Sequence, residues 1–220
     1  KCFYLIGDYA TARSGLEKVA ERDVPEAAEA SHWIGRALLK EKKAQAALTL
    51  LDSAIARHPA SPALPQLLLA RIDAMCDLPE RRAETVPLYA EFSQKYPNDE
   101  LASQAQYMAA LGALEFDDHA AAKANADLFA QRFPADALLP EVLFIGAEAR
   151  LLLKEFHDAE RLYRDFLTRV PQHPNAAQAR IRLGLALLLS DRSSDAIQEL
   201  ENALPNLADP TLKSEALAII

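Results

Sequence analysis

Prolines return at a nearly constant interval along this chain of 220 residues. Six of them are separated by 34, 38, 37, 37 and 34 residues, and they are Pro25, Pro59, Pro97, Pro134, Pro171 and Pro205. A fixed period of this length is typical of repeat proteins, in which each repeat buries its apolar face by stacking on its neighbours. The sequence therefore predicts an array of similar repeats rather than one globular core.

The composition predicts that these repeats are helical. Ala and Leu together make up about a third of the residues, and both are strong helix formers. The β-branched residues that favour sheets are scarce, with 5 Val, 9 Ile and 5 Thr. A sizeable β-sheet is not expected, and the predicted fold class is all-α.

A small residue precedes four of the prolines by 12 positions. It begins an apolar stripe with helical spacing, which is clearest between Ala159 and Val170, and Pro171 then ends the helix. We expect this second helix of each repeat to pack closely through its small residue. These residues are Ala47, Thr85, Ala122, Ala159 and, in the last copy, Ala196.

The first helix of three repeats carries a glycine. Gly35, Gly146 and Gly184 lie 12 or 13 residues before the small residue of the second helix. Glycine inside a helix costs about 1 kcal/mol relative to alanine, so its recurrence indicates a packing reason. Without a Cβ the partner helix can approach closely, and we expect these three glycines to mark one recurring contact.

The glycines, small residues and prolines together resemble the tetratricopeptide repeat. The matching sets are Gly35 with Ala47 and Pro59, Gly146 with Ala159 and Pro171, and Gly184 with Ala196. The resemblance implies an α-solenoid of stacked antiparallel helix pairs, wound as a right-handed superhelix. The longer repeats also resemble those of bacterial envelope proteins, namely the tol-pal-associated repeat protein and the β-barrel assembly lipoprotein.

The period divides the chain into the repeats of a single array, and the first and last repeats are partial. The predicted boundaries are 1–25, 26–59, 60–97, 98–134, 135–171, 172–207 and 208–220. Because both ends fall within a repeat, we expect the chain to be a piece of a longer protein.

The resemblance places the first helices along a concave groove. Positions six and three before the glycine, and one and four after it, share a helix face, so we predict that they line this groove. The candidate groove residues are Glu29, His32, Arg36, Gln106, Arg150, Gln178 and Leu185, where Gln106 is counted from Ala109, which takes the place of the glycine in its repeat. Arg36 and Arg150 would suit an extended or helical peptide segment with apolar anchors and an acidic group. These arginines could instead be solvated, and the apolar members could pack within the superhelix.

Charge and motifs restrict the possible partners and chemistry. The net charge of −8 argues against nucleic acid and anionic membranes. No apolar run approaches the roughly 18 residues that a membrane helix needs. The five histidines are scattered, and the motifs of nucleotide loops and activated nucleophiles are absent. We therefore expect no metal site, no cofactor and no catalytic activity.

Two functions fit these expectations. The first is a non-catalytic interaction scaffold that binds a protein or peptide segment along the groove. The alternative is a structural spacer or self-assembly element of a larger protein. A periplasmic or envelope location is favoured by the resemblance alone.

Overall fold

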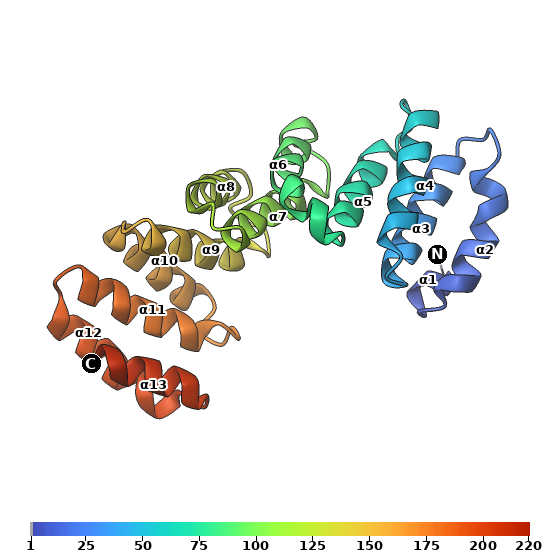
Figure 1. Ribbon diagram of the computed structural model, residues 1–220. Coiled ribbons are helices and arrows are strands. Elements are labelled where there is room, and N and C mark those ends of the chain that lie inside the picture. Colours follow the sequence, from blue (N-terminus) through green and yellow to red (C-terminus); the bar gives the residue numbers. More distant parts are fainter. Residues whose placement is uncertain (1) are drawn as a thin grey trace. The chain divides into compact units, whose positions relative to one another are not determined.

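The computed structural model describes residues 2–220, so Lys1 of the predicted repeat 1–25 lies outside the described residues. Thirteen α-helices and two short 3-10 helices follow one another, with no strand between residues 2 and 220 (Figure 1). Neighbouring helices pack in pairs, and the fold is an all-α solenoid. The predicted fold class is confirmed.

The helices alternate between two positions in each pair, which we call A and B. The A helices are α3 (Ala27–Lys40), α5 (Leu64–Cys76), α7 (Ala102–Glu115), α9 (Leu139–Leu152) and α11 (Ala176–Leu189). The B helices are α4 (Ala44–Arg57), α6 (Thr85–Lys95), α8 (His119–Arg132), α10 (Phe156–Arg169) and α12 (Ser193–Ala203). The remaining elements are α1 (Cys2–Leu5), α2 (Tyr9–Ala20), α13 (Pro210–Ile219) and the 3-10 helices η1 (Pro79–Glu84) and η2 (Leu204–Asn206).

The chain forms two compact units, residues 1–105 and 106–220, and the division falls inside α7. The core of unit 1 consists mainly of Ala and Leu side chains from α3, α4 and α5. Unit 2 has a larger core built from α7 to α12 and a smaller one around Leu200 and Leu207. The division of a single array into repeats at the boundaries given above stays a prediction.

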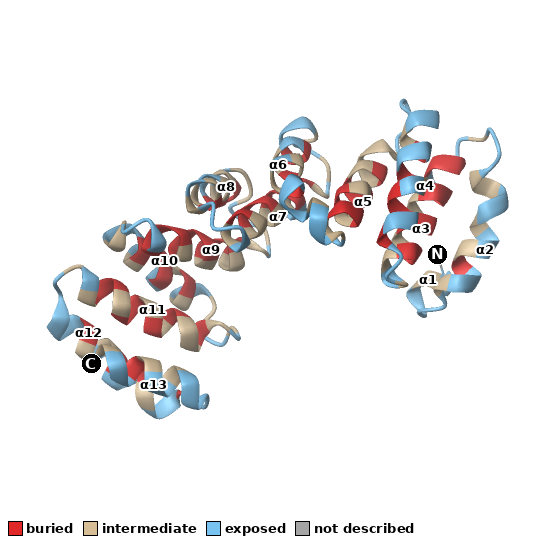
Figure 2. Cartoon of the chain, in the orientation of Figure 1, coloured by how far each residue is buried: buried red, intermediate tan, exposed pale blue. Residues whose placement is uncertain are grey.

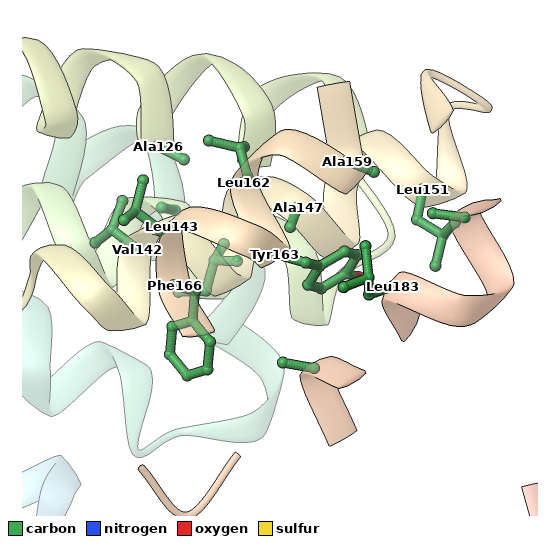
Figure 3. Close-up of a cluster of buried hydrophobic side chains, with 14 of the residues drawn as sticks. Ala126, Val142, Leu143, Ala147, Leu151, Ala159, Leu162, Tyr163, Phe166 and Leu183 are labelled. Atoms are coloured by element: carbon green, nitrogen blue, oxygen red, sulfur yellow. The ribbon is translucent and has the colours of Figure 1, made fainter. Parts of the chain in front are cut away.

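The buried faces of the B helices follow the apolar stripes of the sequence (Figure 2). In α10, Leu162, Tyr163 and Phe166 point into the cluster that also contains Val142 and Leu143 of α9 (Figure 3). The small residues of the B helices are at most 2% exposed, and they are Ala47, Thr85, Ala122, Ala159 and Ala196. A larger side chain at these positions would have to displace the A helix.

Four of the five connections from an A helix to its B helix share one backbone feature, and the exception is the connection from α5 to α6 through η1. The non-glycine residues with positive φ, between 58° and 63°, are Lys42, Asp117, Lys154 and Asp191. Each sits just after an A helix, where a left-handed residue lets the backbone close the helix end. Gly7, with φ of 84°, takes the same place between α1 and α2.

Candidate functional site

Equivalent positions of the A helices can be counted from the first residue of each helix, because these helices begin 37 or 38 residues apart. The third residue is always a carboxylate or a carboxamide, and the five are Glu29, Gln66, Gln104, Glu141 and Gln178. Only Glu29 and Gln178 of these five were among the predicted groove residues. The recurrence of Glu or Gln at the repeat interval was the signal that could have revealed the other three.

Unit 1 contains a cavity of about 530 Å³ on the face formed by α3, α5 and the start of α7. Its lining consists of Tyr4, Glu29, His32, Trp33, Arg36, Pro62, Ala63, Gln66, Leu69, Ala70, Glu100, Leu101 and Gln104. Its volume is within the range of ligand sites, and its lining is mixed, with polar or charged side chains beside aromatic and aliphatic ones. Three third residues of the A helices, Glu29, Gln66 and Gln104, face this single cavity.

The structure brings together three of the predicted groove residues, Glu29, His32 and Arg36, at this cavity. Trp33 connects Glu29 and His32, because its Nε1 donates to Oε1 of Glu29 at 3.4 Å and its ring centroid lies 5.3 Å from that of His32. The ring of Tyr4 packs edge-on against Trp33 at a centroid distance of 5.2 Å. Sequence reasoning missed both aromatic residues, and Tyr4 comes from α1, outside the helices counted above.

The guanidinium of Arg36 is bound by a carboxylate of the next A helix. Its Nη1 donates to Oδ2 of Asp73 at 2.8 Å, and the Tyr89 hydroxyl donates to Oδ1 of the same group at 2.7 Å. Burial raises the pKa of the Asp73 carboxyl, although the Tyr89 hydrogen bond and the Arg36 charge oppose the shift. Burial, together with the charge of Asp73, also raises the pKa of Tyr89. Arg36 therefore reaches the cavity already paired, which weakens the case for an acidic ligand group.

Two of the predicted groove residues lie elsewhere. Arg150 is only 6% exposed, and its Nη2 donates to both carboxylate oxygens of Asp127 in α8, at 2.7 and 2.8 Å. Gln106 is fully buried and donates from Nε2 to Oδ1 of Asn125, also in α8, at 2.8 Å. Both side chains thus join an A helix to a B helix. The groove prediction for them is corrected.

Arg150 was placed on the groove face because the helix positions of its repeat were counted one residue out of step. Gly35 and Gly184 are the ninth residues of their helices, whereas Gly146 is the eighth residue of α9. One residue corresponds to about 100° around a helix, which moves a predicted groove position to the side of the helix. With the corrected register, Ala147 and Glu148 take the places that the sequence analysis gave to Gly146 and Ala147.

The glycines accordingly make two kinds of contact. A Cβ built on Gly35 would lie 2.8 Å from Cδ2 of Leu51, and one on Gly184 would lie 2.6 Å from Cδ2 of Leu200. Gly146 instead faces the Cβ of Ala126, at 3.2 Å. Gly35 and Gly184 therefore share one very close contact with a B helix leucine, whereas the Cβ on Gly146 would lie nearest to Ala126 and 3.4 Å from Cδ1 of Leu162.

Unit 2 repeats the arrangement of Asp73 and Tyr89 at the same coordinates. Glu148 is the tenth residue of α9, as Asp73 is of α5, and it accepts a hydrogen bond from the hydroxyl of Tyr163. Burial raises the pKa of Glu148, and the Tyr163 hydrogen bond opposes this. Arg182 of α11 supplies the cation, with its Nε 3.6 Å from Oε1 of Glu148.

The last two groove candidates, Gln178 and Leu185, are the third and tenth residues of α11 in unit 2. Both are half-buried, and Leu185 packs against the larger core of this unit. That these two residues line a groove and bind a partner stays a prediction.

Residues 2–220 contain no group of three His, Cys, Asp or Glu side chains that could hold a metal ion. None of the helices described in this range has the length and apolar character needed to cross a bilayer.

Comparison with known proteins gives one family. The model of the tetratricopeptide repeat family matches residues 6–62 and 147–209. A search of curated protein sequences gives no match. Among solved structures, YrrB, described as a tetratricopeptide repeat protein with an unusual peptide-binding site, has a TM-score of 0.72 and 15% identity over 92% of this chain and 97% of its own.

Two further structures show the same fold. The pilF protein of Pseudomonas aeruginosa has a TM-score of 0.68 and 19% identity, over 98% of this chain and 92% of its own. A tetratricopeptide repeat protein of Parabacteroides merdae has a TM-score of 0.66 and 16% identity, over 98% of this chain and 82% of its own. At such identities the similarity concerns the fold alone.

Proposed function

The chain belongs to the tetratricopeptide repeat family, and on this premise we propose that unit 1 binds a protein or peptide segment in the cavity between its A helices. Repeats of this family generally serve as protein-interaction scaffolds, and the structurally similar YrrB has a peptide-binding site. The observation that carries the proposal is the cavity of about 530 Å³, where Trp33 and Tyr4 offer apolar faces beside the carboxamides of Gln66 and Gln104.

The lining indicates how a segment would be held. Buried aromatic anchors commonly supply most of the binding energy at such sites, so Trp33 is the expected hot spot. Arg36 is bound by Asp73, and Glu29 and Glu100 add negative charge to the lining. These charges, like the net charge of −8, do not favour nucleic acid as the partner.

Selection from a random peptide library on the immobilised protein tests this function. We expect enriched peptides to lose about tenfold or more in affinity for a variant with Trp33→Ala and Gln104→Ala. The control variant carries Gln45→Ala and Gln94→Ala, two exposed changes on the B helices of the same unit.

Trp33 contributes to packing, so circular dichroism must show that the truncated variant keeps its helices. Gln104→Arg, a change at an exposed residue of the lining, gives a second test that leaves the core intact. Peptides that bind the wild type and both cavity variants equally would rule out the cavity as the binding site.

A self-assembly or spacer role is the second candidate, and one observation favours it. Unit 2 exposes large apolar side chains at the ends of its A helices, namely Phe116, Leu152, Leu153 and Leu189, between 37% and 52% exposed. At the ends of α3 and α5 in unit 1, Lys40, Glu41 and Asp77 take three of these places, and the fourth is Leu78, which is half-buried. If the apolar edge mediates assembly, light scattering will show oligomers that Leu152→Glu with Leu153→Glu dissolves, whereas a wild-type monomer at every concentration would exclude self-assembly. An envelope location of the assembled protein is part of this second proposal.

A further inference from the structure

We propose that unit 2 carries a separate binding site for a carboxylate, the group of a small polar acid or of an acidic side chain, and that Arg180 binds it. The site is a cavity of about 540 Å³, which we call the α12 cavity. Its lining is formed by the turn 171–174, by Ala176, Ala177 and Arg180 of α11, and by four residues between 199 and 206 in α12 and η2. The inference does not depend on the peptide-binding function proposed for unit 1.

The first support is an arginine without a partner. Arg180 is half-buried, and its side chain makes no hydrogen bond or ion pair within residues 2–220. The other buried or half-buried arginines of this range are engaged. Arg132 lies over the ring of Phe133, and six are paired with carboxylates, namely Arg13, Arg36, Arg71, Arg81, Arg150 and Arg182. Because a cation partly removed from water without an anion is costly, a bound carboxylate would complete the site.

The second support is the position of Arg180 in its repeat. It is the fifth residue of α11, and the fifth residues of the other four A helices are Ser31, Leu68, Gln106 and Leu143, none of which is charged. The two polar ones use their side chains inside the protein, since Ser31 and Gln106 both donate hydrogen bonds within their own unit. Arg180 therefore places a charge where the other repeats have a packing residue.

Unit 1 has an equivalent cavity that is not built for an anion. This cavity, of about 520 Å³, has Ser31 at the coordinate of Arg180. Its lining includes two carboxylates, Glu17 and Glu21. Its arginine, Arg57, is already bound, because it donates to two backbone oxygens at the end of α2, at 3.2 and 3.5 Å. The free cation is thus particular to the α12 cavity and does not follow from the repeat fold.

The lining favours a carboxylate over a phosphate. A guanidinium presents two parallel N–H donors, which match the two oxygens of a planar carboxylate. The carboxamides of Asn202 and Asn206 can bond polar groups attached to that carboxylate. Glu199 also lines the cavity, 3.8 Å from Arg164, and its charge repels a doubly charged phosphate more than a carboxylate.

The α12 cavity lies apart from the face on which a groove was predicted. Arg180 follows the groove candidate Gln178 by two residues, which corresponds to about 200° around α11. A carboxylate bound to Arg180 would therefore approach α11 from the side of α12 and not from the predicted groove.

Nuclear magnetic resonance tests the site directly, because the Nε–H group of Arg180 gives its own signal in ¹H–¹⁵N spectra. The probes are acetate, acetyl-aspartyl amide and methyl phosphate, each added at constant ionic strength. We expect millimolar acetate to shift the Arg180 signal and the amide signals of residues 172–180 until they saturate. Sodium chloride at the same ionic strength should leave these signals in place.

Two variants with the same change of charge locate the binding. Arg180→Gln should weaken the binding of acetate, followed by the amide signals, by about tenfold or more. Arg22→Gln removes an exposed arginine of unit 1 and should leave the affinity unchanged.

The probes also distinguish the sources of the carboxylate. If acetyl-aspartyl amide binds about tenfold more tightly than acetate, and Asn202→Ala with Asn206→Ala removes the difference, the site takes an acidic side chain of a protein. Similar affinities for the two mean that the carboxylate alone is recognised, as in a small acid. Methyl phosphate binding more tightly than both would overturn the choice of ligand. Shifts that never saturate, or that persist unchanged in Arg180→Gln, would overturn the site itself.

Discussion

The two units differ at the seventh residue of one A helix. In unit 1 this residue is Ala70 of α5, whose methyl group lines the cavity. In unit 2 it is Arg182 of α11, whose guanidinium pairs with Glu148 of α9 and Glu215 of α13. The seventh position therefore carries a small side chain beside a cavity in unit 1 and a cation that is paired within the protein in unit 2.

The comparison also shows two ways of packing a B helix against its A helix. In the pairs α3/α4 and α11/α12, a glycine accommodates a leucine, as Gly35 does for Leu51. In the pairs α5/α6 and α9/α10, the residue equivalent to that leucine is Tyr89 or Tyr163, and its hydroxyl binds a buried carboxylate. Packing through a tyrosine buries a carboxylate, and a buried carboxylate needs a cation nearby. Each unit supplies this cation from a neighbouring A helix.

The largest expected loss of stability comes from enlarging the small residue of a B helix, which is present in both kinds of helix pair. Ala159 is fully buried, so Ala159→Arg would force a long charged side chain between α9 and α10. We expect a loss of about 3–5 kcal/mol in the free energy of unfolding. Urea unfolding followed by circular dichroism measures it, with Ala124→Arg on the exposed side of α8 as the control. A neutral Ala159→Arg would show that this contact is not close.

Replacing Tyr89 or Tyr163 by phenylalanine is expected to destabilise the two units to different extents. Each change to phenylalanine deprives a largely buried carboxylate of a donor, at a cost of about 1–3 kcal/mol. Asp73 retains Arg36 at 2.8 Å, whereas the Nε of Arg182 is 3.6 Å from Glu148. Tyr163→Phe should therefore destabilise unit 2 more than Tyr89→Phe destabilises unit 1.

Urea unfolding of both variants measures the two losses in the free energy of unfolding. A third variant, Tyr89→Phe with Arg36→Gln, removes both the hydroxyl and the cation from Asp73. The double variant should approach the loss seen for Tyr163→Phe. Equal losses for the two single variants would mean that the cation distance does not matter.

Replacing individual glycines by alanine should change the stability less, and by an amount that depends on how close the nearest neighbour is. Alanine at position 184 would place its Cβ 2.6 Å from Leu200, so Gly184→Ala should cost about 1–2 kcal/mol despite the better helix propensity of alanine. The Cβ in Gly146→Ala would lie 3.2 Å from Ala126, and we expect a change within about 0.5 kcal/mol. Gly15→Ala, with no neighbour within 4 Å, should stabilise α2 by up to about 1 kcal/mol. Thermal unfolding measures these changes. If Gly146→Ala lost as much stability as Gly184→Ala, the two glycines would not differ in their contacts as proposed.

Much of the fold could be predicted because its signals are local. The proline period and the apolar stripe after Ala159 predicted the helix pairs, and Pro171 was predicted to end the helix that the structure shows as α10. Such features depend on residues close in sequence. The sequence alone was therefore sufficient for the fold class.

The site was less predictable because it depends on rotation around each helix and on contacts distant in sequence. Gly146 lies one residue before the coordinate of Gly35, and this shift placed Arg150 on the groove face when it is bound to Asp127. Arg36, predicted to line a groove, does line the cavity, but its partner Asp73 is 37 residues away, and no local pattern indicates the pair. Unpaired charges assumed from the sequence were in fact neutralised in the fold.

The smallest effect is a dependence on pH that reports the burial of Asp73. Its pKa is raised in the folded protein from the ordinary value of 3.8, so the folded state binds this proton more tightly than the unfolded state. The stabilisation is complete below pH 3.8 and is lost as pH rises toward the raised pKa. The free energy of unfolding of the wild type, relative to Asp73→Asn, should therefore fall as pH increases from about 3.8. Urea unfolding of both proteins across this range measures the difference.

Arg36→Gln tests the cause of this pH dependence, because it removes one of the two groups that hold the pKa of Asp73 down. The fall in stability with pH should become larger in this variant, and Glu148 in unit 2 should respond in the same direction to Arg182→Gln. A wild type that gains stability relative to Asp73→Asn as pH rises would show that Arg36 and Tyr89 outweigh burial. The carboxylate would then stabilise unit 1 in its charged form, and the polar packing solution would carry no cost at neutral pH.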